Sequence, residues 1–318
     1  MIPLADIEAA TARIASHIHR TPLYRNTTLS DRFGTNIYLK MELFQKTGSF
    51  KPRGAFNQLM ALREETGAER FVGVSGGNFA QGFAYAAAEL GLDATVVMAE
   101  STPAHYIAAT KGYGASVELV PGIAEAFERA SELAEAGLVQ AHPFDHPAMM
   151  AGNGSLGLEV IEDVPDLTDV YISVGGGGFI TGVGSAILAK RPDTRIHAVE
   201  TDGAQVMADS LAAGEPMRMT PTSVSRTLGS PYLAAAAFDF AREHIAESVV
   251  VSDGDAYAAL VLLLERAKVV AEIAASCTLA ALSRDAEQYG TDDHVVLVLC
   301  GGNVSVADLA MYRERFDR

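Results

Sequence analysis

Two kinds of hydrophobic pattern alternate along the chain. Short runs rich in Val, Ile and Leu are separated by longer Ala-rich stretches in which apolar residues recur at helical spacing. The short runs predict β-strands, and the stretches between them predict helices that cover both faces of a mostly parallel sheet. The predicted strands are Ile37–Met41, Phe71–Val74, Ala94–Met98, Ser116–Val120, Val170–Val174, Arg195–Val199, Ser248–Val251 and His294–Leu299.

Helices are predicted after most of these strands. Within Ser101-Thr102-Pro103, we expect Thr102 to cap a helix whose first turn contains Pro103. The segment Ala213–Pro231 predicts a long loop, which either borders a site or is a plain surface connection. The fold class is therefore doubly wound α/β. The predicted helices are Phe79–Leu90, Pro103–Gly112, Ile123–Ala136, Phe179–Lys190, Asp255–Ala267 and Val304–Arg313.

Length and charge narrow the class of protein. A chain of 318 residues suits two α/β lobes or one large domain, and two lobes would have a cleft between them. The formal net charge of −16 disfavours nucleic acid and anionic membranes as partners. Two cysteines are too few for a disulfide framework, and we find neither a membrane-length apolar run nor a signal peptide. We therefore expect a soluble, cytoplasmic protein.

Four consecutive glycines, Gly175 to Gly178, stand between a predicted strand and a predicted helix. Backbone amides without side chains can wrap a phosphate there, and the helix N-terminus adds its positive dipole. A tight turn is an equally good interpretation of the tract alone. A dinucleotide site is disfavoured, because its glycine motif normally follows the first strand of the fold.

Two further loops join a strand to the segment after it. Ser75-Gly76-Gly77-Asn78 offers a hydroxyl, amides and a neutral side-chain donor that can hold an anion such as a substrate carboxylate. Cys300-Gly301-Gly302-Asn303 brings a thiol to the carboxyl end of a strand, where open α/β sheets bind ligands. Taken alone, Cys300 is more simply explained as a small buried hydrophobic residue.

The segment Thr47-Gly48-Ser49-Phe50-Lys51-Pro52-Arg53-Gly54-Ala55 contains the candidate nucleophile. Lys51 is followed directly by proline and flanked by glycines and Phe50. Burial lowers the pKa of a lysine and lets the neutral amine attack a carbonyl carbon. Without the other loops, a surface lysine would be the simpler interpretation.

Taken together and in this order, the motifs resemble one branch of the fold-type II pyridoxal-phosphate (PLP) enzymes, the serine/threonine dehydratases and serine racemases. The similarity covers essentially the whole chain and is most specific in the lysine segment and the tetraglycine loop. It implies a tryptophan synthase β-like fold with a large PLP-binding domain (1–62 and 146–318), a small substrate-clamping domain (63–145) and a homodimer. The matching segments are Arg20-Thr21-Pro22-Leu23, KMELFQKTGSFKPRGA, SGGNFAQG, SVGGGG and CGGN.

The resemblance also implies roles for individual residues. Lys51 would join covalently to the cofactor and later take the Cα proton of the substrate. A thiol facing the ring nitrogen is too weak an acid to keep it protonated, which favours loss of a β-leaving group over transamination. The remaining implied roles are Phe50 against the ring, Asn78 at its phenolic oxygen, Gly175, Gly176, Gly177 and Gly178 around the phosphate, Ser75, Gly76, Gly77 and Asn78 around the substrate carboxylate, and Cys300 at the ring nitrogen.

The implied activity is that of an ammonia-lyase, or dehydratase. It would convert threonine, serine, or a relative such as 3-hydroxyaspartate or phenylserine to a 2-oxo acid and ammonia. An amino-acid racemase and a β-replacement synthase of the same fold are the alternatives. Synthases usually have Lys-Asp-Arg where this chain has Lys51-Pro52-Arg53, and a non-enzymatic binding protein gives Lys51 no purpose among three ligand loops.

The chain departs from the family at several positions. Gly76 stands where racemases carry an acid/base serine, so racemisation should be weak. Phe79 replaces a histidine. Arg226 lies where many relatives have Ala-Asp-Gly, and it either sits on a solvated loop or contacts a second substrate carboxylate. Glu272 matches a family glutamate near the site, with its role left open.

A cation site known in several relatives is incomplete here. Glu200 and Ala204 match two of its ligands, but Val206 replaces the third, so we expect no metal at this place. The chain ends soon after the CGGN loop, from which we expect no regulatory domain of the kind appended to biosynthetic threonine deaminases.

Overall fold

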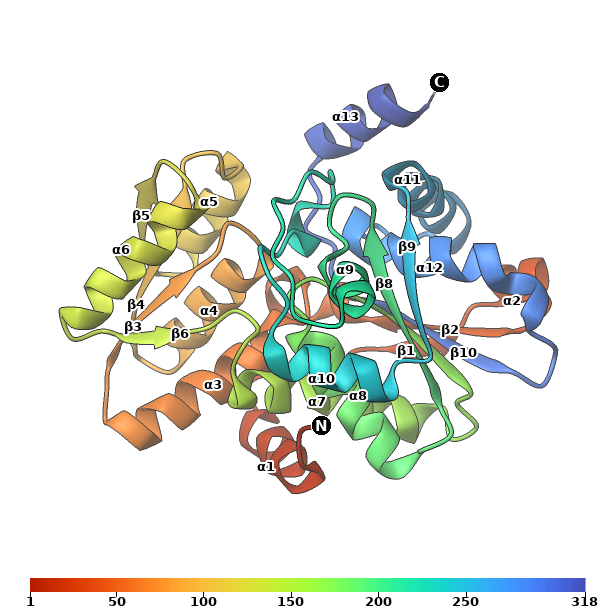
Figure 1. Cartoon of the computed structure of the whole chain (residues 1–318), viewed down its shortest axis with the longest axis horizontal. Helices are drawn as coiled ribbons and strands as arrows, with labels where there is room; N and C mark the ends of the chain where they lie inside the picture. Colours follow the sequence, from red (N-terminus) through yellow and green to blue (C-terminus); the bar gives the residue numbers. More distant parts are fainter. Residues whose placement is uncertain (318) are drawn as a thin grey trace.

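The computed structural model describes residues 1–317 and contains two sheets. The larger sheet has six strands in the order β1-β2-β10-β7-β8-β9 (Figure 1). The edge strand β1 pairs antiparallel with β2, and all other neighbours are parallel. The central strands are buried along almost their whole length, which explains their continuous apolar runs. Their bounds are β1 Leu23–Arg25, β2 Asn36–Met41, β10 His294–Leu299, β7 Asp169–Ser173, β8 Arg195–Thr201 and β9 Glu247–Val251.

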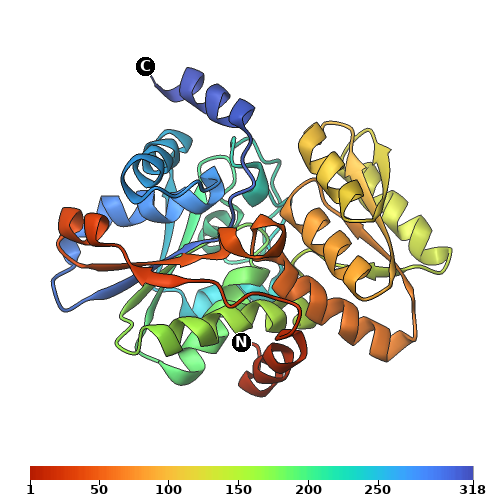
Figure 2. The same ribbon diagram turned by 180° about the vertical axis from the view of Figure 1, so that it is seen from behind.

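The second sheet has four parallel strands in the order β5-β4-β3-β6. All of them come from residues 70–141, and they form a separate lobe with α4, α5 and α6 (Figures 1 and 2). One hydrophobic cluster lies in the large lobe, and two others lie in the small lobe. One of those two also includes Ile14, Ala55, Phe56, Leu59, Leu62 and Met149 from outside that lobe. The strands are β5 Ser116–Val120, β4 Asp93–Ala99, β3 Arg70–Val74 and β6 Val139–Ala141.

Thirteen α-helices surround the sheets within residues 1–317. Glycines let α7 and α8 pack closely, because a Cβ on Gly182 would lie only 2.0 Å from the Met150 carbonyl oxygen. This contact fixes α8, whose N-terminus carries the glycine tract. The helices are α1 Leu4–Ile14, α2 Thr27–Phe33, α3 Lys51–Thr66, α4 Asn78–Glu89, α5 Ala104–Gly112, α6 Ile123–Glu135, α7 Pro147–Asp163, α8 Gly178–Lys190, α9 Val206–Ala213, α10 Ala235–His244, α11 Asp253–Leu262, α12 Ile273–Asp285 and α13 Val306–Phe316.

The predicted α/β class is confirmed, and each predicted strand is present within one or two residues of its expected bounds. The three-residue strands β1 and β6 were not predicted because they are too short to show a pattern. Several helices were also not predicted. Among these, α7 and α12 are buried nearly all round, so they lack the polar face that reveals a surface helix.

The start of α5 differs from the prediction. Pro103 itself is the residue before the helix, with φ −56° and ψ 138°, and no side chain caps this end. The prediction that Thr102 caps α5 is therefore wrong, because the extended Pro103 leaves Thr102 one residue too early to reach the first turn. A smaller difference concerns the predicted helix Asp255–Ala267, whose last five residues form the π-helix Leu263–Ala267.

The predicted long loop is confirmed. Between the end of α9 and the start of α10, the only helical turn is the short 3-10 helix Arg226–Leu228 within residues 214–234. This connection belongs to the larger lobe but reaches across to the opening between the two sheets (Figure 1).

Candidate active site

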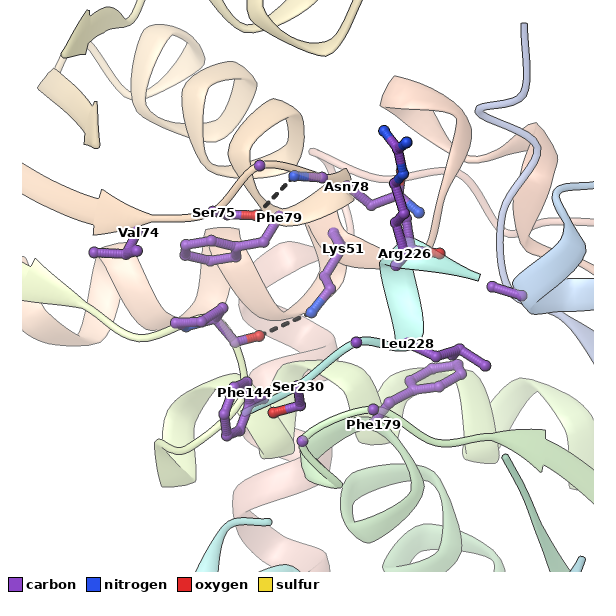
Figure 3. Close-up of a pocket in the computed structure, with 18 of the residues that line it drawn as sticks. Lys51, Val74, Ser75, Asn78, Phe79, Phe144, Phe179, Arg226, Leu228 and Ser230 are labelled. Carbon is purple, nitrogen blue, oxygen red and sulfur yellow. Dashed lines mark hydrogen bonds between the residues drawn. The ribbon is translucent and has the colours of Figure 1, made fainter. Parts of the chain in front are cut away.

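A cavity of about 520 Å³ lies where the loops of the two sheets meet (Figure 3). Loops at the carboxyl ends of β3, β4, β7 and β10 line it, together with the 3-10 turn at 226–228. This is the edge at which parallel α/β sheets bind ligands. Every site residue predicted above from the sequence lines this one cavity, although these residues are spread along the chain from Phe50 to Cys300.

Lys51 occupies the first position of α3, and its amine points into the cavity (Figure 3). Its Nζ donates to the Pro143 carbonyl oxygen at 2.8 Å and lies 5.0 Å from the ring centre of Phe50. Burial lowers the pKa of this amine from 10.5 to about 8, although the nearby Cys300 and Glu272 act in the opposite direction. A usable fraction of the amine is therefore neutral near physiological pH.

The glycine tract turns from β7 into α8 with no room for side chains. Gly177 has φ +87°, which favours glycine. A Cβ on Gly176 would meet the Phe144 ring at 2.3 Å, and one on Gly178 would meet the Phe144 carbonyl oxygen at 2.1 Å. The tract therefore presents bare backbone amides to the cavity, next to the N-terminus of α8.

The loop Ser75–Asn78 turns from β3 into α4 on the opposite side of the cavity. Its backbone is held by a bond from the Gly77 amide to the Ser75 hydroxyl at 3.1 Å (Figure 3). Asn78 is the first residue of α4, so this loop also lies at a helix N-terminus. The loop and the glycine tract thus face the same cavity with two sets of amide donors.

Asn78 belongs to a buried hydrogen-bond chain that joins the two lobes. Its amide nitrogen donates to Glu272 Oε1 at 2.9 Å, and its oxygen accepts from Asn303 Nδ2 at 2.8 Å. Thr227 also donates to Glu272 Oε1, at 3.3 Å. The other carboxyl oxygen, Oε2, is buried without a partner in residues 1–317, and burial raises the pKa of Glu272 to about 7.

Cys300 directly follows β10 and lines the cavity. The Ser173 hydroxyl donates weakly to its Sγ at 3.8 Å. Burial raises the pKa of this thiol well above its ordinary value, so it stays protonated at neutral pH.

Aromatic rings form two of the cavity walls. Phe50 stacks on Phe179 with ring centres 3.7 Å apart, and Phe79 lies 5.8 Å from the Lys51 amine. Phe79, which replaces a family histidine, packs against Phe83 in the small lobe. These rings give the region around Lys51 apolar walls.

Arg226 lies at the rim of the cavity rather than at its floor. It is exposed, and its side chain extends away from the Lys51 amine (Figure 3). No carboxylate in residues 1–317 forms an ion pair with it. Its guanidinium is thus placed between solvent and the mouth of the cavity, so both interpretations of this residue stay open.

Several cavity residues were not found from the sequence. Pro143 and Phe144, in the loop after β6, hold the lysine amine and the glycine tract, respectively. Neither belongs to a recognisable motif, and β6 itself was too short to be predicted. Thr102 and Tyr106 also line the cavity from the loop after β4 and from α5.

Glu200, the one carboxylate of the incomplete cation site, has other partners. Its two oxygens accept from the backbone amides of Met207 and Ala208, each at 2.8 Å, at the start of α9. Burial raises the pKa of Glu200 to about 8. Within residues 1–317 no cluster of three or more His, Cys, Asp or Glu could hold a metal ion.

The residues around the cavity fit a phosphorylated aldehyde. A partly neutral lysine amine suits the aldehyde carbon, and a cradle in which any Cβ would collide suits the phosphate. The fold and the cavity together define the class of protein as a PLP-dependent enzyme. The chain belongs to the family of pyridoxal-phosphate dependent enzymes, whose model matches residues 14–301, and the resemblance noted in the sequence is thereby confirmed.

Relatives with known names point to one branch of this family. The chain is 39% identical over 317 residues to an L-threonine ammonia-lyase of Thermotoga maritima, covering 96% of this chain and 77% of that protein. It superposes on the T.th. threonine deaminase with a TM-score of 0.89 at 36% identity, covering 95% and 98% of the two chains. For maize serine racemase the TM-score is 0.91 at 31% identity, covering 98% and 97%.

None of the helices within residues 1–317 combines the length and the apolar character that a membrane span requires.

Proposed function

We propose that this PLP-dependent enzyme removes water and then ammonia from a small β-hydroxy amino acid, with L-threonine and L-serine as the first substrates to test. The products would be a 2-oxo acid and ammonia. One observation carries the proposal: a single cavity joins a desolvated lysine amine to a side-chain-free phosphate cradle and a second loop of amide donors. The names of the relatives support the same reaction.

Lys51 and the glycine tract would hold the cofactor. Lys51 would bond to its aldehyde carbon, and the amides of Gly175, Gly176, Gly177 and Gly178 would bind its phosphate. When bound, pyridoxal phosphate supplies an electron sink for the charge that develops at the substrate Cα. Phe50 would contact the ring face and Asn78 the phenolic oxygen, while the protonated Cys300 thiol leaves the ring nitrogen neutral.

The loop Ser75–Asn78 would bind the substrate carboxylate through its hydroxyl and its amides at the start of α4. With the carboxylate fixed on the small lobe, the freed amine of Lys51 takes the proton from Cα. Its pKa of about 8 suits a group that must accept and release a proton near neutral pH. The β-hydroxyl would then leave as water, with its proton supplied by the phosphate group held on the glycine tract, because a ring with a neutral nitrogen stores charge at Cα only weakly.

Gly76 argues for elimination rather than racemisation. A racemase needs a second proton donor on the face opposite the lysine, and Gly76 has no side chain to supply one. We therefore expect the D-isomer to be a minor product at most.

We further propose that residues 63–145 form a small domain that closes on the substrate against a large domain of residues 1–62 and 146–318. Residue 318 lies outside the described range. The chain of hydrogen bonds from Asn78 to Glu272 and Asn303 would tighten on closure. We also propose a cytoplasmic homodimer without nucleic-acid or membrane partners, on the basis of the acidic charge and the family.

Product analysis tests the reaction. Purified enzyme is incubated separately with L-threonine, L-serine, 3-hydroxyaspartate and phenylserine, and 2-oxo acid, ammonia and D-isomer are measured. The proposal expects equal amounts of 2-oxo acid and ammonia from at least one substrate. D-isomer without 2-oxo acid would show that the enzyme is a racemase. If 3-hydroxyaspartate is turned over faster than the other substrates, and Arg226→Ala removes this preference, Arg226 contacts the second carboxylate of the substrate.

A further inference from the structure

Two strand-end loops of the small lobe lie side by side at the mouth of the cavity. Strands β3 and β4 are parallel neighbours, so the loops after them, 75–77 and 100–103, emerge at the same edge. A bond from the Ser75 amide to the Val97 carbonyl oxygen, at 3.3 Å, ties the first loop to β4. Thr102 in the second loop is thereby brought against Gly76 in the first.

The Thr102 hydroxyl occupies the space that a side chain on Gly76 would need. A Cβ built on Gly76 would lie 2.7 Å from Thr102 Oγ1, which is too close for any real contact. The same Cβ would lie 3.4 Å from Thr102 Cγ2 and 3.6 Å from Thr102 Cβ, both tolerable distances. A side chain at position 76 therefore fits only if the Thr102 hydroxyl turns away from its present position.

This hydroxyl has no structural task in the described range 1–317. It does not cap α5, because Pro103 precedes the helix and no side chain bonds to its first turn. It forms no hydrogen bond with another residue among 1–317, and it is half-buried in the wall of the cavity. A half-buried hydroxyl without a partner beside a loop of amide donors is placed to donate to a ligand.

We propose that Thr102 is a further substrate-binding residue, whose hydroxyl donates to the substrate carboxylate from the position that a side chain on residue 76 would otherwise fill. This inference rests on the proposed carboxylate clamp at Ser75–Asn78. It makes Gly76 and Thr102 one unit: the glycine is required because the threonine hydroxyl is there. A hydrogen bond to a carboxylate is charge-assisted, so its loss should weaken binding measurably.

The first experiment compares Thr102→Val, which keeps the shape, with Thr102→Ser, which keeps the hydroxyl. The holoenzyme is titrated with L-alanine and with ethylamine, which is alanine without its carboxylate, and the change in cofactor absorbance gives each dissociation constant. We expect Thr102→Val to weaken L-alanine binding about tenfold and ethylamine binding less than about twofold, with Thr102→Ser near wild type. Equal losses for both ligands, or no loss for either, would overturn the inference.

The second experiment tests whether the two residues share one space. Gly76→Ala should weaken L-alanine binding strongly because its Cβ displaces the Thr102 hydroxyl. In the Thr102→Ala background, Gly76→Ala should weaken L-alanine binding little further, since only the tolerable 3.6 Å contact between the two Cβ atoms remains. In the Thr102→Val background the clash should persist, because a valine methyl replaces Oγ1. Additive effects in all backgrounds would show that the positions are independent.

The swap Gly76→Ser with Thr102→Ala returns a hydroxyl from the opposite loop. It should bind L-alanine more tightly than Thr102→Ala alone, and failure to do so would count against the carboxylate contact.

These measurements are separate from the proposed reaction. Ligand binding is read from absorbance, so a wild-type enzyme that binds L-alanine but yields no 2-oxo acid would refute the lyase proposal and leave the Thr102 inference to its own test. Unchanged cofactor absorbance and thermal unfolding of each variant would show that the lysine site and the fold are intact. If a position-76 variant loses either, the comparison of Thr102→Val with Thr102→Ser still decides the inference, because neither enlarges the side chain.

Discussion

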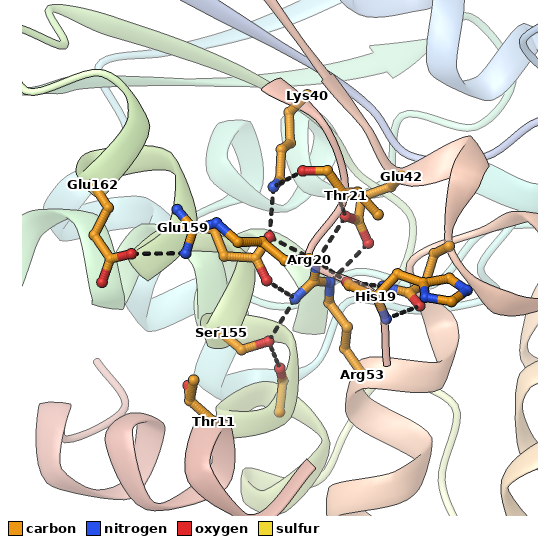
Figure 4. Close-up of polar contacts among 12 residues, drawn as sticks. Thr11, His19, Arg20, Thr21, Lys40, Glu42, Arg53, Ser155, Glu159 and Glu162 are labelled. Carbon is orange, nitrogen blue, oxygen red and sulfur yellow. Dashed lines mark hydrogen bonds and ion pairs between the residues drawn. The ribbon is translucent and has the colours of Figure 1, made fainter. Parts of the chain in front are cut away.

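Lys51 and Arg53 stand two residues apart in the first turn of α3, and both are cations taken out of water, yet their surroundings are opposite. Arg53 is fully buried in the large lobe, where its side chain lies between Glu42 and Glu159 (Figure 4). Its guanidinium donates to both oxygens of Glu42, at 2.8 and 2.9 Å, and to both oxygens of Glu159, at 2.7 and 2.9 Å. Among residues 1–317, the Lys51 amine has a single hydrogen-bond partner, the Pro143 carbonyl oxygen.

The buried charges around Arg53 are balanced. Lys40 also binds Glu159, and Thr21 donates to Glu42, so two cations face two anions (Figure 4). The paired carboxylates raise the pKa of Arg53 beyond its already high value, despite burial. Burial dominates at Lys51, where no carboxylate is paired with the amine, and it lowers the pKa.

Both cations are buried, but their pKa values shift in opposite directions because only Arg53 is paired with carboxylates. A fully paired charge cluster fixes the start of α3 in the large lobe. The unpaired amine two residues earlier is thereby held still in a site that favours its neutral form. Rigidity and reactivity are supplied by neighbouring residues of one helix turn.

The largest expected effect is on activity, from Lys51→Ala. It should lower turnover by at least about 10³-fold and abolish the absorbance of bound cofactor, since the nucleophile is gone. Stability should change little, because only one hydrogen bond is lost. Turnover and the absorbance spectrum are measured beside the surface control Lys190→Ala. A variant that kept both activity and spectrum would remove Lys51 from the mechanism.

Arg53→Leu should have the opposite profile, with a large loss of stability. It leaves Glu42 and Glu159 buried with too little positive charge, which costs about 3 to 5 kcal/mol in the free energy of unfolding. Urea unfolding measures this against wild type. Arg53→Lys, which keeps the charge but not the forked geometry, should lie between the two and remains informative if the leucine variant does not fold. An unchanged midpoint for both variants would contradict the role given to the cluster.

A smaller effect is expected from Glu272→Gln, which tests how much the charge of Glu272 raises the pKa of Lys51. Negative charge on Glu272 raises that pKa, so its removal should shift the pKa below about 8. Only the neutral amine attacks the aldehyde, so apo-enzyme should capture pyridoxal phosphate faster as pH rises through the pKa. The pH midpoint of the capture rate should fall in the variant, giving a gain of less than about tenfold at pH 7. A midpoint that stays or rises would contradict the assigned sign.

The smallest effect is expected from Arg20→Ala at the outer side of the charge cluster. Arg20 also binds two carboxylates, Glu162 at 2.7 Å and Asp163 at 2.6 Å, but half of its side chain is exposed (Figure 4). Water screens such pairs, so unfolding should become easier by no more than about 1 kcal/mol. A loss as large as that of Arg53→Leu in the same urea experiment would mean that burial is irrelevant to these ion pairs.

Much of the site could be predicted from the sequence. The lysine segment, the tetraglycine loop and the loops at 75–78 and 300–303 each follow or precede a short apolar run. Each of the loops at 75–78, 175–178 and 300–303 follows the carboxyl end of a strand, where α/β sheets bind ligands, and the packing of the two sheets brings them to one cavity. Local chain geometry was enough because each motif combines its own backbone requirement with its own chemistry.

The remaining features depend on contacts between residues far apart in the chain. The balance of Arg53 with Glu42 and Glu159, the unpaired oxygen of Glu272 and the meeting of Thr102 with Gly76 leave no local pattern. The sequence determined which groups were present and at which strand ends they stand. Only the tertiary structure decided which of them are paired. Pairing requires donor and acceptor atoms to lie within hydrogen-bond distance, and that distance is set by the packing of the two sheets and their helices.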